Sequence, residues 1–287
     1  MASSHSIRPV VDTFTTAWHS FRGDASGAWM LHPADLHALD PVVIVDHFRM
    51  STPTFPPHPH AGFSAVTYLF EDSEDGFVNR DSLGHHLDIA PGALHWTQAG
   101  SGVLHEEIPR IVGRVSHGLQ LFVNSAASHK ASAPVMFHRG AREVQAVELA
   151  GGARVRVVLG LFGDVQATIG AHTPLTLLDI TLPPDGVLDV PMAAGERAFA
   201  VVARGGLAGA AAQAPHALRF GDQGEVVRLH AGSEGLHLAL IAGRPLGEPI
   251  VPKGPFIGNS AAEVTDMIRR FQAGQMGSLA PTPGAFN

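Results

Sequence analysis

Residues 55–63 read FPPHPHAGF, and this stretch carries the clearest structural signal in the chain. His58 and His60 stand two residues apart, and the prolines at 57 and 59 favour extended backbone and disfavour a helix. In an extended strand, residues i and i+2 project to the same face. The segment therefore predicts a strand that presents two imidazoles to one metal ion, with a surface loop of two solvated histidines as the competing interpretation.

A second pair follows in residues 91–107, PGALHWTQAGSGVLHEE, where His105 and Glu107 again stand at i and i+2. Both side chains should lie on one face of a strand, while Glu106 between them turns outward. A glutamate inside an apolar barrel is costly unless it is ionised against a cation. We therefore predict a metal site of His58, His60, His105 and Glu107, an N3O set suited to Fe, Mn, Ni, Cu or Zn.

Other histidines are weaker candidates. His95 could replace His105 as a ligand, but we favour a polar residue at a barrel mouth. The stretch HEEIP is not the helical zinc-protease motif, because Pro109 stands where the second histidine is needed. His117 and His138 each stand alone and are interpreted as satisfied or solvated side chains. No second metal site is expected in the second half, where the histidines are widely separated: His172, His216, His230 and His237.

Turn residues recur throughout the chain, with 32 Gly and 21 Pro, and the apolar runs between them are short. Many short strands at close spacing predict an all-β fold. Two series of such runs, closed by GLQLFVN at 118–124 and LHLALIAG at 236–243, flank the polar stretch NSAASHKASAP at 124–134. This layout predicts a duplicated β-barrel, with one barrel over residues 1–130 that carries the metal site and one over 131–287 without metal, joined by a linker.

One helix is expected near the C-terminus, in residues 260–274, SAAEVTDMIRRFQAG. Ser260 as N-cap and Glu263 three residues later form a capping box. Val264, Ile268 and Phe271 then fall on one face, and Gly274 is placed to end the helix. The tail after it, SLAPTPGAFN, is expected to be an arm or a disordered end.

Composition limits the possible functions. The 287 residues include 19 basic and 26 acidic ones, a formal net charge of -7 that argues against direct nucleic-acid binding. There is no cysteine, which excludes thiolate metal sites and disulfides, whereas 18 histidines offer imidazole ligands. No stretch has the length of a membrane span or the form of a secretory signal, so no membrane partner and a cytoplasmic location are expected.

These stretches together resemble the pirin family of the cupin superfamily. HPHAGFSAVTYLFE at 58–71 is similar to the family signature HPHRGFETVTYLLEG, and residues 78–107 are similar to its later run of RDS, PGD, Trp, AG and HSE. The similarity continues through LDPVVIVDHF at 39–48, residues 240–257 and the closing helix. Ala61 stands where the family usually has Arg, and Ser64 where it usually has Glu, which predicts a changed charge around the pocket.

The resemblance implies two tandem, jelly-roll-like antiparallel cupin barrels with a C-terminal helix, and a metal, typically iron, bound in the N-terminal barrel by the same four residues. Mn, Ni, Cu, Zn or Co could replace iron. It also implies a quercetin 2,3-dioxygenase-like enzyme that acts on an aromatic small molecule, with Glu107 accepting the proton of the substrate hydroxyl. Phe63, Phe70 and Trp96 are candidate pocket walls. The alternative is a non-enzymatic regulator, sensitive to its metal or redox state, that acts through a protein partner.

Overall fold

The computed structural model describes residues 5–21, 26–209 and 216–286. Two compact units are present, and the described residues are largely β-strand, as predicted. The N-terminal unit comprises Trp18–Glu143, Gly170–Thr173 and Leu246–Asn287, and the C-terminal unit comprises Met1–Ala17, Val144–Ile169 and Pro174–Pro245. The division is therefore not a single cut at residue 130, because the first strand joins the later unit and the C-terminal helix joins the earlier one.

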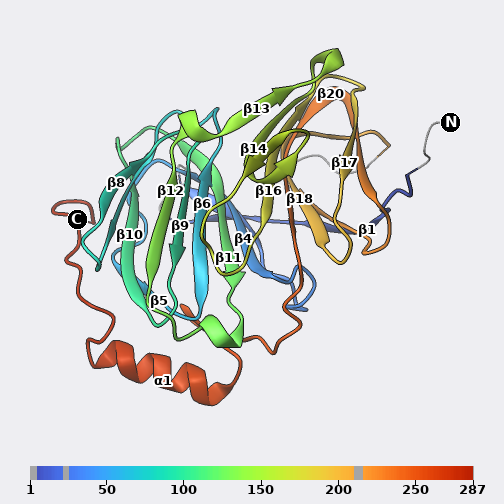
Figure 1. Cartoon of the computed structure of the whole chain (residues 1–287). Helices are drawn as coiled ribbons and strands as arrows, with labels where there is room; N and C mark the ends of the chain where they lie inside the picture. The colour runs from blue at the N-terminus through green and yellow to red at the C-terminus, as the bar shows by residue number, and fades with distance from the viewer. Residues whose placement is uncertain (1–4, 22–25, 210–215, 287) are drawn as a thin grey trace. The chain divides into compact units, whose positions relative to one another are not determined.

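The N-terminal unit contains an antiparallel sheet of seven strands whose centre is β11 (Ser116–Asn124). On one side of β11 lie β6, β9 and β12 (Figure 1), and on the other side lie β4, β3 and β2. Their bounds are β2 (Trp18–Ser20), β3 (Gly27–Leu31), β4 (Val42–Met50), β6 (Phe63–Leu69), β9 (Leu94–Gln98) and β12 (Val135–Arg139).

A second sheet of the same unit has four strands in the order β5-β10-β7-β8. These are β5 (His58–His60), β7 (Phe77–Asp81), β8 (His86–Ile89) and β10 (Val103–Pro109). The central strand β10 places His105 opposite His58 on β5, and Glu107 opposite Asn79 on β7. The two predicted ligand pairs are therefore held by neighbouring strands of one sheet.

The C-terminal unit contains a sheet ordered β1-β19-β18-β20-β16-β14-β13, with β15 and β17 attached to its side. β20 lies between β16 and β18, as β11 lies between β4 and β6. The bounds are β1 (Val10–Thr15), β13 (Gln145–Glu148), β14 (Arg154–Phe162), β15 (Val165–Ala167), β16 (Thr176–Leu182), β17 (Val187–Pro191), β18 (Arg197–Leu207), β19 (His216–Phe220) and β20 (Val226–Gly243).

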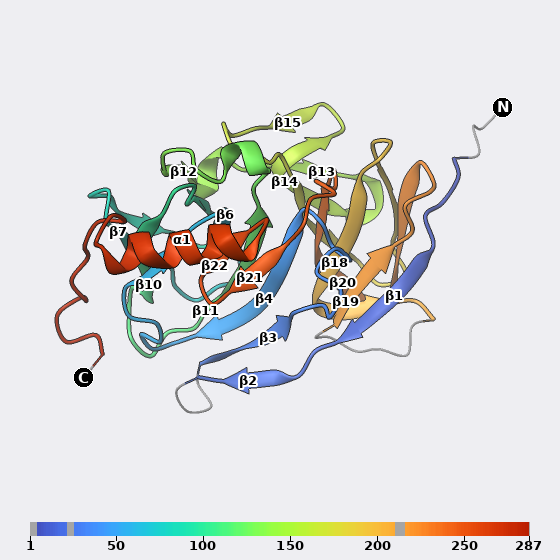
Figure 2. The same ribbon diagram turned by 90° about the horizontal axis from the view of Figure 1, so that it is seen from below.

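The predicted helix is α1 (Ala261–Gln272), and its capping agrees with the sequence. The Ser260 hydroxyl accepts from the backbone N–H of Glu263, whose carboxylate accepts from the N–H of Asn259. The buried face consists of Val264 and Met267, whereas Phe271 is partly exposed. The helix runs beside β21 (Val251–Lys253) and β22 (Phe256–Gly258) in Figure 2. None of the helices in the described ranges is long and apolar enough to cross a membrane.

The stretch predicted as a linker, residues 124–134, has a defined local structure and a buried side chain. It contains a short 3-10 turn, η1 (Ala127–His129), followed by Lys130, which is 5% exposed. The Lys130 ammonium donates to the carbonyls of Gly62 and Ile257 and to the side chain of Asn124. A buried ammonium needs such acceptors, so this lysine ties the segment to the turn between β5 and β6, to the end of β11 and to residues 256–258. Two further turns, η2 (Ala141–Glu143) and η3 (Ala150–Gly152), flank β13.

Candidate metal centre

Three histidines converge inside the N-terminal unit. The ring centroids of His58, His60 and His105 form a nearly equilateral triangle with sides of 4.7, 4.8 and 4.7 Å. One nitrogen from each ring lies within 4.8 Å of the others, and this trio is the one cluster of three or more possible metal ligands found in the described parts of the chain. The register explains the convergence, because His105 lies directly opposite His58 and His60 projects to the same face as His58.

The spacing of the ring nitrogens fits a shared ion. The Nε2 atoms of His60 and His105 stand 2.9 Å apart, which is the separation of two nitrogens bound at about 2.0–2.1 Å and at a right angle to one metal. The Nδ1 atom of His58 donates to the carbonyl of Pro56 at 2.9 Å, so its Nε2 carries the free lone pair. The residues present therefore fit a mononuclear metal.

Burial keeps these imidazoles in the form that binds metals. Burial lowers the pKa of His58, and it lowers the pKa of His60 and of His105 well below the ordinary value. A charged imidazole nearby would lower these pKa values further. Neutral imidazole is the metal-binding form, so the cluster is ready to bind a cation over a wide pH range.

Glu107 lies on the same face of β10 and lines the same pocket as the three histidines. Its Oε2 accepts a hydrogen bond from the Thr67 hydroxyl at 2.6 Å and one from the Gln120 amide at 3.3 Å. Burial raises the pKa of Glu107 to about 7, and the Thr67 bond opposes that shift. The close cluster of nitrogens does not include this carboxylate, so its role as fourth ligand stays a prediction.

Glu106, which was expected to turn outward, lies on the other face of β10 from His105 and Glu107. Its side chain points away from the pocket but is fully buried. Arg80 donates to it at 2.9 Å, and the backbone and hydroxyl of Thr282 also bond to its carboxylate. The C-terminal segment, expected to be an arm or disordered, thus covers the outer face of the strand that carries His105, and Arg80 also donates to the carbonyl of Ala280.

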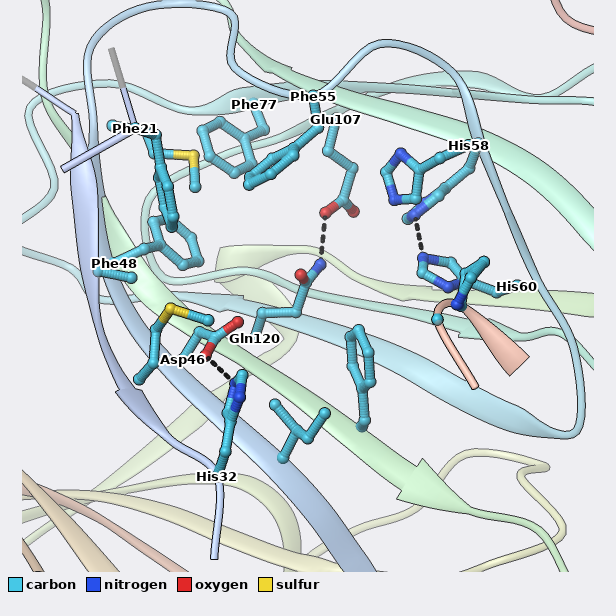
Figure 3. Close-up of a pocket in the computed structure, with 18 residues that line it drawn as sticks. Phe21, His32, Asp46, Phe48, Phe55, His58, His60, Phe77, Glu107 and Gln120 are labelled. Atoms are coloured by element: carbon cyan, nitrogen blue, oxygen red, sulfur yellow. Dashed lines mark hydrogen bonds and ion pairs between the residues drawn. The ribbon is translucent and has the colours of Figure 1, made fainter. Parts of the chain in front are cut away.

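The triangle opens onto a pocket of about 490 Å³ in the N-terminal unit (Figure 3). Much of its wall is aromatic and apolar, and the phenylalanines that line it are Phe21, Phe48, Phe55, Phe77 and Phe122. The sequence suggested Phe63, Phe70 and Trp96 instead, but none of these lines the pocket. They are fully or almost fully buried in the core, where Phe63 packs on Phe122 and Phe70 packs against His47 and His117.

The histidines ranked lower in the sequence lie elsewhere. His95 is buried on β9, opposite Thr67, and burial lowers its pKa to about 3, but it belongs neither to the triangle nor to the pocket lining. His117 bonds to His47 and to Asp72. The two departures from the family pattern do not line the pocket either. Ala61 packs with Phe256, and Ser64 is buried, so neither position sets the charge of the pocket wall.

Three polar pocket residues were not found from the sequence. His32, Asp46 and Gln120 line the pocket and stand singly in the chain, with no short spacing that marks them. Asp46 and Gln120 are opposite each other on β4 and β11, and Gln120 is opposite Thr67 on β6. Their arrangement follows from strand register, which a single sequence does not specify.

A double-sheet unit with three inward-facing histidines beside an aromatic pocket defines a metal-binding cupin. The family model for pirin matches residues 26–123, and the family model for the pirin C-terminal cupin domain matches residues 177–277. A pirin-like protein of Arabidopsis thaliana is 34% identical over 247 residues, which cover 81% of this chain and 78% of the relative. The chain belongs to the pirin family.

Solved structures show the same fold. The crystal structure of quercetin 2,3-dioxygenase from Acinetobacter baumannii has a TM-score of 0.84 at 25% identity, and covers 95% of this chain and 99% of that one. A bacterial pirin from Escherichia coli in complex with nickel has a TM-score of 0.63 at 18% identity, over 82% of this chain and 99% of that one. The two-barrel cupin fold predicted from the sequence is therefore confirmed.

Proposed function

We propose that this pirin-family protein is a metal-dependent dioxygenase that cleaves a flavonol such as quercetin. The observation that carries the proposal is the triangle of His58, His60 and His105, which faces an aromatic pocket with Glu107 at its side. The likeness to the Acinetobacter quercetin 2,3-dioxygenase supports the choice of substrate class.

The three imidazoles and Glu107 would hold the ion, and iron is the proposed metal, with Mn, Ni, Cu, Zn and Co as competitors for the same donor set. When bound, the metal supplies Lewis acidity toward a substrate oxygen and the redox chemistry that dioxygen requires. The neutral state of the three histidines favours loading at neutral pH, because no proton has to be displaced from them.

In this proposal, Glu107 takes the substrate's proton. Burial raises its pKa to about 7 in the metal-free protein. As a carboxylate beside the substrate, it would accept a proton from a bound hydroxyl group and later return it. Thr67 and Gln120 both bond to its Oε2, which orients the carboxylate and leaves Oε1 as the oxygen able to receive the proton. These two residues therefore position the proposed base.

The aromatic wall would orient the substrate and exclude water from it. Phe48 and Phe77 stack face to face, with centroids 5.2 Å apart and planes 10° apart, and Phe21 packs edge-on against Phe55. Such a wall suits a flat aromatic ring and offers few hydrogen bonds to a small polar molecule. Binding would be driven by burial of the ring, and the reaction would be directed by the polar groups at the histidine end.

The test is an aerobic assay of iron-loaded protein with quercetin, following both flavonol loss and oxygen consumption. We expect one oxygen consumed for each flavonol cleaved, and a loss of roughly 100-fold or more in the rate for Glu107→Gln, the size typical of removing a general base. Asp266→Ala, an exposed change on α1, is the control and should not alter the rate. Metal-loaded protein with no turnover would contradict the proposal and favour a regulator that acts through a protein partner.

A further inference from the structure

The pocket has a second polar group, in another part of its wall from the histidine triangle. His32, the residue directly after β3, and Asp46 on β4 both line the pocket, and His32 Nε2 lies 3.1 Å from Asp46 Oδ1 (Figure 3). The Asp46 side chain is 20% exposed and the His32 side chain 43% exposed, so the pair is accessible to a ligand. Within the described ranges, no bond joins the second Asp46 oxygen, Oδ2, to another residue.

Strand register connects this pair to the proposed base. Asp46, Gln120 and Thr67 lie opposite one another on β4, β11 and β6, so they form one polar row across the sheet. The Gln120 amide reaches Glu107. Directly opposite side chains stand about 5 Å apart at Cβ. Asp46 is therefore the cross-strand neighbour of Gln120, the residue that bonds to Glu107.

Apolar side chains border this row. Ile44 and Phe48 flank Asp46 on β4, and Phe122 flanks Gln120 on β11, and all three line the pocket. A ligand that fills the space would meet apolar side chains along its length and polar groups both at the histidines and at Asp46. A carboxylate at such a place accepts a hydrogen bond from a hydroxyl group, and a bond to a charged acceptor is stronger than a neutral one.

We propose that the His32–Asp46 pair is a specificity site that binds a phenolic hydroxyl group at the far end of the aromatic substrate. The hydroxyl donates to Asp46, and His32 holds the carboxylate in place. The inference rests on the proposed function in one respect, the choice of flavonols as the class of substrate. It assigns the recognised substrates as flavonols that carry a hydroxyl group on the pendant ring, bound with that ring away from the histidines. The competing interpretation is an ion pair that merely ties β3 to β4.

The experiment measures binding without turnover. Iron-loaded protein is titrated in the absence of oxygen with quercetin and with galangin, the flavonol that lacks hydroxyl groups on its pendant ring, and dissociation constants are read from fluorescence quenching. We expect the wild type to prefer quercetin by roughly tenfold, the effect of one hydrogen bond to a charged group. Asp46→Ala should abolish that preference, because quercetin loses the acceptor of its pendant hydroxyl group and galangin has no such group, and Asp266→Ala should keep it.

Two results would overturn the inference. One is a wild type that binds both flavonols equally, and the other is a preference that survives in Asp46→Ala, as expected if the pendant hydroxyl groups face the histidines instead. Neither result bears on turnover. Conversely, a preference that depends on Asp46 in a protein without quercetin cleavage would leave this inference standing and remove the proposed function.

Discussion

The two units of this chain share a strand order but differ in what fills their interiors. In the C-terminal unit, Leu238 on the central strand β20 lies opposite Ile180 and Val202, and all three are fully buried in one apolar cluster. In the N-terminal unit, the central strand β11 has Gln120 in a polar row with Asp46 and Thr67. The apolar row lies in a closed core, whereas Asp46 and Gln120 of the polar row line a pocket of about 490 Å³.

This difference shows that the site depends on the inward-facing side chains and not on the sheet. An apolar row stabilises its unit by burial, at about 25 cal/mol for each Å² of apolar surface removed from water. A polar row gives up part of that stabilisation, and the N-terminal unit also bears the desolvation of Glu107 and the histidines on its second sheet. We therefore expect that shortening a side chain of the apolar row will destabilise the C-terminal unit. We expect the N-terminal unit to gain stability when the Glu107 carboxylate is neutralised.

The largest effect is expected in the apolar row. Leu238→Ala removes a fully buried side chain and should lower the free energy of unfolding by about 2–5 kcal/mol, measured by calorimetry. Val187→Ala, at a position 56% exposed in the same unit, is the matched control and should change it by less than about 0.5 kcal/mol. Metal content should be the same in both variants. Equal stability of Leu238→Ala and wild type would break the comparison.

The second prediction concerns Glu107→Gln, which should raise the free energy of unfolding relative to wild type by an amount that depends on pH. The pKa of Glu107 is about 7 in the folded protein and 4.5 ordinarily, so the folded state binds the proton more tightly. The stability that this group contributes is complete below about pH 4.5 and is lost as the pH rises through about 7. Glu107→Gln cannot lose a proton, so the metal-free variant should gain on the wild type as the pH is raised.

The expected gain is about 3 kcal/mol between pH 4.5 and pH 8, since the two pKa values differ by about 2.5 and each pH unit is worth 1.36 kcal/mol. Unfolding by denaturant at several pH values measures it. The buried histidines are common to both proteins and cancel in the difference. If the gap between variant and wild type is independent of pH, then Glu107 is not desolvated in the way that the polar interior requires.

The smallest effect concerns the outer face of the metal-site strand. Thr282→Val removes the hydroxyl that bonds to Arg80 and to the buried Glu106, and should cost about 1–2 kcal/mol of unfolding free energy. Thr282→Ser keeps the hydroxyl and should restore most of it. Metal content should not change, because Glu106 faces away from the histidines. Loss of metal in Thr282→Val alone would show that the two faces of β10 are coupled.

The sequence was sufficient for the features that depend on local spacing. Two residues of separation in a strand placed His58 with His60, and His105 on the same face as Glu107, and capping chemistry located α1 from Ser260. These predictions needed only the strand and helix periods, because the groups that meet are close in the chain.

Features that depend on register between distant strands were missed. The aromatic wall uses Phe48 and Phe77 in place of the suggested Phe63, Phe70 and Trp96. His32 meets Asp46 only through the pairing of β3 with β4. Lys130 was assigned to a linker because its neighbours are small and polar, yet its acceptors come from residues as far away as Ile257. Alternation along one strand gives the face of a side chain but not its partner.

The most direct test of the central claim is the metal content of the protein purified from cells, measured by elemental analysis. Wild type is compared with the double variant His58→Ala, His60→Ala, and with His19→Ala, His86→Ala, two exposed histidines of the same unit, as the control. The account predicts about one metal per chain in wild type and control, as for a mononuclear site, and almost none in the first variant. Wild type without metal, or a His58, His60 variant that retains it, would contradict the assignment of the triangle as a metal centre.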